Sequence, residues 1–300
     1  MRNGEFEAAW KISDRILNAM QTDLPLHFKP VWNGESIDGK WVLVRCNRGL
    51  GDSIQCARWL PLVKARSRSL NIVCVPPLGE VFSASADVDR VFTSEEACDA
   101  DADVEVEIME LPYLFRTTLD SLPRQVPYVF PKLNRRVRPS HTRMRVGLVW
   151  QAGDWDRRRS IPFDSLGPIF EVAGIDFIIL QLEPRAAGWT PGRGAPVPCE
   201  TLYKTAQVMR TLDLMISVDT MTAHLAGALG VPTWTLLHSD PDWRWLKTGD
   251  ESPWYPTMRL FRQEIAGDWH PVMAAVALQL TAFGSPSRSK RRSRMTSVCP

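Results

Sequence analysis

Four polar side chains that could bind or orient a ligand follow an apolar run at residues 214–218. They are Asp219, Thr220, Thr222 and His224. The residues after them have the composition of a short helix that ends before Gly230 and Pro232, and a second apolar run follows at residues 233–237. We expect a βαβ unit whose helix begins at the carboxyl edge of a parallel sheet. The free amides and the partial positive charge of such a helix N-terminus predict a diphosphate site.

The roles expected within this segment differ from residue to residue. Asp219 or Thr220 caps the helix, and the Thr220 and Thr222 hydroxyls bind a phosphate together with the first-turn amides. Asp219 orients the loop or touches the ligand, and His224 adds a donor one turn later. The same residues are also compatible with a capping Asp and a helix histidine that bonds to a backbone carbonyl. One His and one Asp are too few for a zinc site.

A second set of candidates is the sequence Gly49-Leu50-Gly51-Asp52, which follows an apolar run at residues 41–46. Two glycines let the backbone turn tightly and approach a ligand closely. The third glycine of a dinucleotide fingerprint is replaced by Ile54, so a dehydrogenase is disfavoured. The Asp52 carboxylate could accept a proton from a hydroxyl, which is general-base chemistry. The alternative is that Asp52 only caps the following helix.

Two charged loops are further candidate sites. Arg157, Arg158 and Arg159 follow a predicted strand at 145–150, and a guanidinium there could bind two oxygens of a departing diphosphate. A solvated basic loop is the alternative for each arginine. The acidic run at residues 99–103 resembles a DxD metal site, but it lies in a polar loop away from both predicted phosphate edges, so we expect no metal there.

Composition predicts a globular protein of two domains. Its net charge is too small to attract nucleic acid to the protein as a whole. The chain has 300 residues, 44% hydrophobic content and a net charge of +2. Six cysteines without a CxxC spacing fit a reducing cytoplasm. No run approaches the roughly 18 apolar residues of a membrane span, and the acidic N-terminus does not resemble a signal peptide.

The chemistry-bearing residues must be positioned by two α/β regions. The first has predicted strands at 41–46, 70–75, 90–92 and 104–108 and a helix at 53–66. The second has strands at 145–150, 177–182, 214–218 and 233–237 and helices after Pro162, at about 200–212 and at 269–283. A helix at 5–20 precedes both. Parallel strands in two successive regions imply a cleft between two domains.

Several of these motifs, in this order, resemble the glycosyltransferase domain found behind tetratricopeptide repeats in bacterial proteins, a relative of glycosyltransferase family 9, the lipopolysaccharide heptosyltransferases. They are GLGDSIQCARWLPLV, VGLVWQAGDWDRRRSIP, DLMISVDTMTAHLAGALGVPTWTLL and DWRWLKTGDESPWYPTMRLFRQ. The resemblance spans about residues 30–283. It implies the GT-B fold, an α/β class with two Rossmann-like domains whose parallel sheets face a central cleft.

The resemblance implies a helical remnant of a repeat at 1–22, an acceptor domain at 30–140 and a nucleotide-sugar-binding domain at 143–266. The sequence pattern adds a helix at 268–283, and the low apolar content of the basic tail at 284–300 predicts disorder. The resemblance also carries the role of catalytic base to Asp52. Arg159 corresponds to a Lys found three residues before a Pro in the heptosyltransferases, which makes it the first choice among the three arginines.

The resemblance places the remaining site residues on the two facing edges. The predicted donor diphosphate ligands are Arg159, Ser217, Thr220, Met221, Thr222 and His224. Other predicted cleft residues are Gly49, Gly51, Gln55, Asp219 and Asp242. Asp240 and Arg244 border the same pocket, whereas Trp243, Trp245, Trp254 and Trp269 are expected to pin a long loop onto the second domain.

The expected function is inverting, metal-independent sugar transfer from a nucleotide diphosphate sugar to a hydroxyl of a glycan, a lipid-linked glycan or a protein, with no cofactor. A catalytically inactive nucleotide-sugar-binding or scaffold protein and a nucleotide-sugar epimerase are the alternatives. We expect a cytoplasmic protein, at most peripheral at the inner membrane through five basic residues within 288–294, which give weak contact with anionic lipid. No specific nucleic-acid partner is expected.

Overall fold

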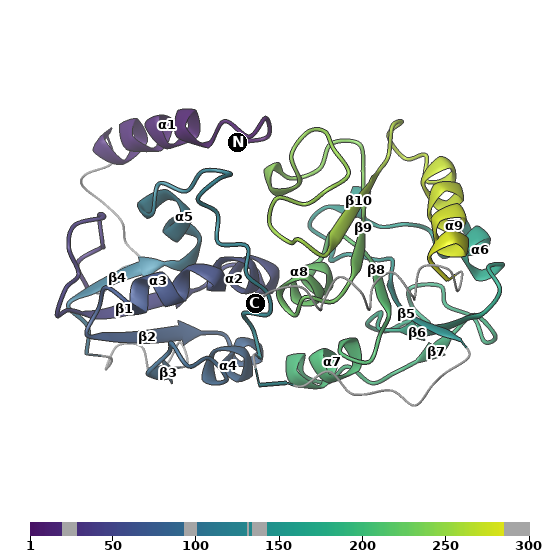
Figure 1. Ribbon diagram of the computed structural model, residues 1–300, viewed down its shortest axis with the longest axis horizontal. Helices are drawn as coiled ribbons and strands as arrows, with labels where there is room; N and C mark the ends of the chain where they lie inside the picture. Colours follow the sequence, from purple (N-terminus) through teal and green to yellow (C-terminus); the bar gives the residue numbers. More distant parts are fainter. Residues whose placement is uncertain (20–28, 93–100, 131, 134–142, 285–300) are drawn as a thin grey trace, which may run out of the picture.

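Two parallel sheets organise the protein into an N-terminal and a C-terminal half (Figure 1). The computed structural model describes residues 1–19, 29–92, 101–130, 132–133 and 143–284. The acidic run is therefore described only from Asp101 onward, and the basic linker at 134–142 and the tail at 285–300 lie outside the described residues. The predicted α/β class with two Rossmann-like halves is confirmed.

The N-terminal sheet has the strand order β3-β2-β1-β4, and every pair is parallel. Its strands are β1 (Trp41–Cys46), β2 (Ser69–Cys74), β3 (Arg90–Phe92) and β4 (Val104–Glu107). Apolar side chains dominate β1 and β2, and both strands are buried along most of their length, as expected for a sheet covered on both faces. The predicted bounds of β1 and β3 are confirmed, and those of β2 and β4 shift by one residue.

The C-terminal sheet has the order β10-β9-β8-β5-β6-β7, again with parallel pairs throughout. Its strands are β5 (Met144–Val149), β6 (Ile175–Ile179), β7 (Ala195–Pro196), β8 (Leu214–Val218), β9 (Thr233–Leu237) and β10 (Met258–Arg262). The predicted βαβ unit is confirmed with β8 and β9 at their predicted bounds. Neither β7 nor β10 was predicted, because neither stands in a long apolar run.

The helices cover the two sheets. They are α1 (Phe6–Ala19), α2 (Leu50–Cys56), α3 (Leu60–Lys64), α4 (Pro76–Ser83), α5 (Leu111–Leu114), α6 (Gly167–Phe170), α7 (Leu202–Met209), α8 (Met221–Ala228) and α9 (His270–Gly284). Short 3₁₀ turns of importance below are η1 (Ala57–Trp59), η4 (Arg157–Arg159) and η6 (Trp243–Trp245). Helix α8 ends as predicted, because Gly230 takes a positive φ of 70° that favours glycine.

The prediction of one helix at 53–66 is wrong. The helix begins earlier, at Leu50, and Gly49 is its N-cap. It then tightens into the 3₁₀ turn η1 and restarts as α3, which has Pro61 in its first turn. A proline lacks the amide that a continuous helix needs, and it is tolerated at a helix start. Asp52 therefore lies inside the first turn of α2 and is not its cap.

One continuous apolar core joins the two halves. It includes Trp59 and Val63 of the N-terminal half and Trp245, Trp254 and Tyr255 of the C-terminal half. A second core cluster lies within the C-terminal half and contains Trp269. The C-terminal residues Trp245, Trp254, Tyr255 and Trp269 are at most 5% exposed. The prediction has the tryptophans pin a long loop onto the second domain, whereas Trp245 and Trp254 of the loop before β10 pack into the core shared by both halves.

A buried cation lies within this shared core. Arg58 is 3% exposed, donates from Nη1 to the Trp254 carbonyl at 2.6 Å and from Nη2 to the Tyr128 hydroxyl at 2.9 Å. Its guanidinium also lies over the Tyr255 ring at 4.7 Å. A buried charge without partners is costly, and these contacts provide the partners of Arg58. They also tie the loop before β10 to η1 of the other half.

Helix α1 lies over the N-terminal half with its first residues beside the loops of the C-terminal half (Figure 1). Trp10 donates from Nε1 to the Thr117 carbonyl at 2.7 Å, whereas Phe6 contacts Trp243 with 6.1 Å between ring centroids. The described part of the predicted helix at 5–20 thus contacts both halves. Within the described ranges, no helix has the length and apolar character needed to cross a membrane.

Candidate active site

The N-termini of α2 and α8 meet where the two halves join. A Cβ added to Gly51 would lie 2.8 Å from Cδ2 of His224 and 3.3 Å from Cα of Met221, so only glycine fits without a shift. Figure 1 shows both helices between the two sheets, α2 from one half and α8 from the other. The two motifs predicted to face each other are therefore adjacent.

Of the two caps predicted for α8, Asp219 and Thr220, the structure shows Thr220. Its hydroxyl accepts the Thr222 amide at 3.2 Å, which closes the first turn. Met221 is the first helical residue, so its amide has no acceptor within the helix. Ser217 is fully buried and donates its hydroxyl to the Val218 carbonyl at 2.8 Å. Its side chain is thus engaged within β8, whereas Thr220 and Met221 stand at the start of the helix.

Arg159 lies in the loop that follows β5 and reaches the same helix start. Its Nη1 donates to the Asp219 carbonyl oxygen at 2.9 Å, and the residue is 7% exposed. Asp156 caps the turn η4 that carries it. The guanidinium lies 4.1 Å from the ring of Trp155, a side chain that is 78% exposed. A fixed cation and a helix N-terminus therefore lie next to each other, which is the arrangement that binds phosphate oxygens.

The neighbouring arginines of η4 are placed differently. Arg157 is exposed and makes a loose contact with Asp154 at 3.7 Å. Arg158 pairs with Asp156 at 2.9 Å while 63% of its side chain is exposed. The structure thus separates one buried arginine, Arg159, from two exposed ones.

Asp219 is a buried carboxyl group beside this cation. It is 8% exposed, and burial raises its pKa to about 6 against the lowering effects of the Trp245 indole and the Arg159 guanidinium. Because the native state then retains its proton at a higher pH than the unfolded chain does, ionisation of Asp219 destabilises the fold. This destabilisation develops as pH rises through about 4 to 6 and is complete above that range.

Asp219→Asn is therefore expected to stabilise the protein near neutral pH. A raised pKa of about 6 corresponds to at most about 3 kcal/mol in the free energy of unfolding at pH 7.5, and the advantage shrinks by about 1–2 kcal/mol at pH 5. Urea unfolding of both proteins at the two pH values measures it. The exposed Asp164→Asn controls for the loss of one charge. An advantage that is equal at both pH values would contradict the role assigned to burial.

His224 is fixed by two aromatic residues. Its Nδ1 lies 2.9 Å from the Tyr255 hydroxyl, and its ring stacks on Trp245 with 5.3 Å between centroids. Burial holds the pKa of His224 well below its usual value, so the ring is neutral at physiological pH. When Tyr255 donates to Nδ1, the ring proton lies on Nε2, 4.0 Å from Asp219 Oδ1. The histidine is satisfied by a tyrosine and not by a backbone carbonyl.

Asp52 is held by an arginine from the other half. Its Oδ1 accepts from Arg244 Nη2 at 2.7 Å, and 30% of its side chain remains exposed. Gln55, 1% exposed, accepts from Arg244 Nε at 2.7 Å, and Asp242 accepts from Nη1 at 2.8 Å. The structure therefore brings Asp52, Gln55 and Asp242 together around the Arg244 guanidinium, which the sequence analysis places only at the border of the pocket.

Glu107 is a titratable group that sequence reasoning missed. It ends β4 beside β1, and burial raises its pKa to about 7 although the Asn47 amide donates to it. The alternation Val-Glu-Val-Glu is typical of a strand with one exposed face, so the sequence carries no signal for a half-buried carboxyl at Glu107. The acidic run, in contrast, has a structural role where it is described, since Asp103 accepts the Trp41 amide at 2.8 Å.

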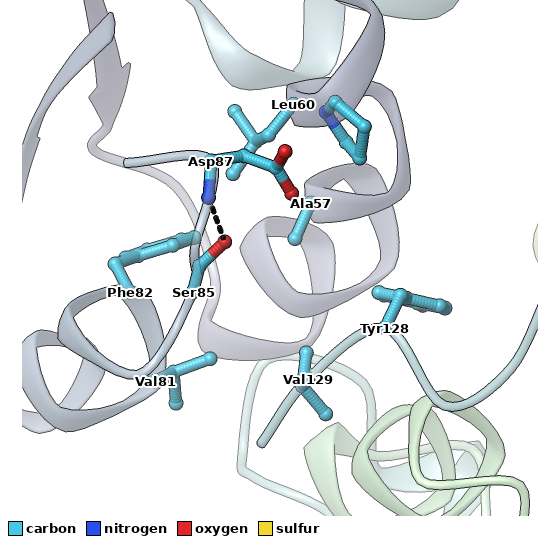
Figure 2. A pocket seen from close by; sticks show the side chains of 9 residues that line it. Ala57, Leu60, Val81, Phe82, Ser85, Asp87, Tyr128 and Val129 are labelled. Carbon is cyan, nitrogen blue, oxygen red and sulfur yellow. Dashed lines mark hydrogen bonds between the residues drawn. The ribbon is translucent and has the colours of Figure 1, made fainter. Parts of the chain in front are cut away.

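A small pocket lies elsewhere on the N-terminal half (Figure 2). Apolar side chains such as Leu60, Val81 and Phe82 line most of it, and the Asp87 amide donates to Ser85 at its rim at 3.3 Å. None of the predicted site residues lines this pocket. It is therefore separate from the junction of α2 and α8.

Comparisons with known proteins bear on the fold. No protein-family model matches the chain. The chain is similar to the protein FlbA of Caulobacter vibrioides, with 26% identity over 330 residues that cover 94% of this chain and 53% of FlbA. The chain thus spans about half the length of this curated relative.

Solved structures with the same fold are bacterial glycosyltransferases. They include the E. coli ADP-heptose lipopolysaccharide heptosyltransferase II, with a TM-score of 0.56 and 13% identity over 81% of this chain and 98% of that chain. The E. coli heptosyltransferase WaaC with ADP has a TM-score of 0.53 and 14% identity over 81% of this chain and 98% of that chain. The glycosyl transferase family 9 protein of Veillonella parvula has a TM-score of 0.52 and 14% identity over 77% of this chain and 88% of that chain. The expected GT-B fold is confirmed, whereas the association with tetratricopeptide repeats stays a prediction.

Proposed function

We propose that this protein is a glycosyltransferase that moves a sugar from a nucleoside diphosphate to a hydroxyl group, with inversion at the anomeric carbon and without a metal ion. The observation that supports this most strongly is that a positively charged edge of one half meets a carboxylate of the other half. Arg159 and the start of α8 offer positive charge on one half, and the partly exposed Asp52 carboxylate faces the same junction from the other.

The steps follow from these positions. The acceptor hydroxyl attacks the anomeric carbon and passes its proton to the Asp52 carboxylate. The bond from that carbon to the phosphate oxygen breaks, and its electron pair leaves with the nucleoside diphosphate. Arg159 and the Met221 amide stabilise the charge that develops on the leaving group. Attack from the side opposite the leaving group inverts the configuration.

The donor class is proposed from the fold relatives and from the site chemistry. ADP and ADP-2-deoxy-2-fluoro heptose are the ligands named for the WaaC structures. A nucleoside diphosphate sugar would meet the cation and helix start described above. The acceptor is proposed to be a glycan, a lipid-linked glycan or a protein hydroxyl.

A panel of nucleoside diphosphate sugars in a thermal-shift assay tests the donor, because a ligand that binds only the folded state raises the melting temperature. Product analysis then tests the reaction. Release of nucleoside diphosphate with a glycosylated acceptor supports transfer, isomerised donor in the absence of acceptor would indicate an epimerase, and stabilisation without turnover would indicate a binding protein.

A chelator is expected to leave transfer unchanged. Within the part of the chain that the structure describes, no three His, Cys, Asp or Glu side chains gather as a metal site. Under this proposal the cation's role belongs to Arg159 and the start of α8. Initial rates with and without excess EDTA measure this, with added Mg²⁺ as the reverse test. Complete loss of activity in EDTA that Mg²⁺ restores would overturn metal independence.

A further inference from the structure

The turn η6 contacts three separate parts of the chain through three consecutive side chains. Trp243 contacts Phe6 of α1, with 6.1 Å between ring centroids. Trp245 stacks on His224 of α8 at 5.3 Å. Arg244, between them, reaches α2 of the N-terminal half. One short turn therefore joins the N-terminal helix, the proposed donor edge and the proposed proton acceptor.

The guanidinium of Arg244 uses all three of its nitrogens within this junction. Its Nη2 donates to Asp52 Oδ1 at 2.7 Å, its Nε to Gln55 Oε1 at 2.7 Å and its Nη1 to Asp242 Oδ1 at 2.8 Å. Its side chain is 10% exposed, against 30% for Asp52 and 31% for Asp242. The cation thus lies behind two carboxylates that both retain a solvent-facing surface.

The Asp52 carboxylate is held at Oδ1, and Gly49 leaves room for Oδ2. Oδ1 accepts from Arg244, and Oδ2 lies over Gly49, where an added Cβ would be only 2.9 Å away. A larger residue at 49 would push against the carboxylate. Arg244 therefore orients the carboxylate, and Gly49 permits that orientation because it has no side chain.

The backbone that carries Arg244 is itself well anchored. The Trp254 indole donates to the Arg244 carbonyl oxygen, and Trp254 also contacts Trp243 with 5.6 Å between ring centroids. The Arg244 guanidinium packs 4.9 Å from the Trp243 ring. A planar guanidinium held in this way can donate in three fixed directions, whereas a lysine ammonium is a flexible point charge.

We propose that Arg244 is the positioning residue for the proton acceptor, holding the Asp52 carboxylate of one half from the half that binds the donor. This inference rests on the proposed function. A carboxylate that must take a proton in the transition state acts only from a narrow range of positions, and a displacement of about 1 Å can cost about 10²-fold in rate. Arg244 acts through Asp52 and does not itself take part in proton transfer.

The test is a double-mutant cycle on transfer kinetics. Arg244→Gln in the wild-type background is expected to lower kcat by about 10²-fold while the affinity for the nucleoside diphosphate changes by less than about 3-fold. In the Asp52→Asn background the same substitution is expected to change kcat by less than about 3-fold, because the group that it positions is already inactive. Arg244→Lys is expected to recover only part of the rate.

Arg262→Gln is the matched control. Arg262 donates to the carbonyl oxygens of Leu246, Trp245 and Gly249 in the same loop, but it does not contact Asp52. Its loss is expected to lower the melting temperature at least as much as Arg244→Gln does, with kcat within about 3-fold of wild type.

Each outcome of the cycle decides the inference. Equal losses from Arg244→Gln in both backgrounds, or a loss confined to donor affinity, would overturn it and leave the proposed function intact. An equal fall of kcat in the Arg262 control would show that loop stability explains the effect. A wild-type protein that transfers no sugar would overturn the proposed function and this inference with it.

Discussion

Asp52→Asn is expected to reduce turnover by about 10²–10⁴-fold while donor binding stays close to wild type. The amide keeps the size of the carboxylate and leaves an oxygen that can accept from Arg244, so the junction of the two halves is preserved. It cannot take a proton from the attacking hydroxyl. Steady-state transfer kinetics together with calorimetric titration of the nucleoside diphosphate separate the two effects.

A matched control for this substitution is Asp38→Asn, an exposed position on the same half whose carboxylate accepts from Ser36. It removes the same charge without touching the junction, so its turnover is expected to equal that of wild type. Turnover of Asp52→Asn near the wild-type rate would show that another group accepts the proton. Glu107, whose pKa of about 7 suits a general base, is then the first group to examine.

Arg159→Gln is expected to lower kcat/KM by about 10²–10³-fold, through both a weaker nucleoside diphosphate complex and a slower transfer step. The buried guanidinium is fixed against the Asp219 carbonyl oxygen, so its charge is already in position when negative charge develops on the leaving group. Titration with the nucleoside diphosphate and single-turnover transfer measure the two contributions.

Two further variants sharpen this prediction. Arg159→Lys keeps the charge and introduces the residue type of the heptosyltransferase motif, but it loses the planar donor geometry, so an intermediate rate is expected. Arg157→Gln removes a charge from the same turn, where 86% of the side chain is exposed, and is expected to leave the kinetics unchanged. Equal losses from Arg157→Gln and Arg159→Gln would mean that the loop contributes only a diffuse positive field.

The two substitutions probe opposite sides of one junction. Asp52 and Arg159 lie on different halves, and the described contact of Gly51 with Met221 and His224 brings their helices together. Loss of the base is expected to affect the rate alone, whereas loss of the cation affects rate and ligand affinity. This difference distinguishes proton transfer from leaving-group stabilisation within the same protein.

Local sequence patterns determined most of the elements. The buried strands β1, β8 and β9 were predicted at their observed bounds because continuous apolar runs are bounded by turn residues. The sequence narrows the cap of α8 to Asp219 or Thr220 and places its end at Gly230, because these roles depend on neighbouring backbone groups alone. The prediction of one helix at 53–66 is wrong because it gives too little weight to Pro61. Strand β10 is missed because its extended conformation depends on pairing with β9 and not on a local pattern.

The sequence by itself therefore determined the two α/β halves and the edges at which Asp52, Arg159 and Thr220 stand. Only the tertiary structure decided which side chains meet there. Arg244 pairs with Asp52 although 192 positions separate them, and no local pattern encodes such a contact. Nor could the sequence assign the raised pKa of Asp219, because that value depends on how much water the packed halves exclude. Strand and helix signals are short-range, whereas partners, burial and charge environment are properties of the assembled chain.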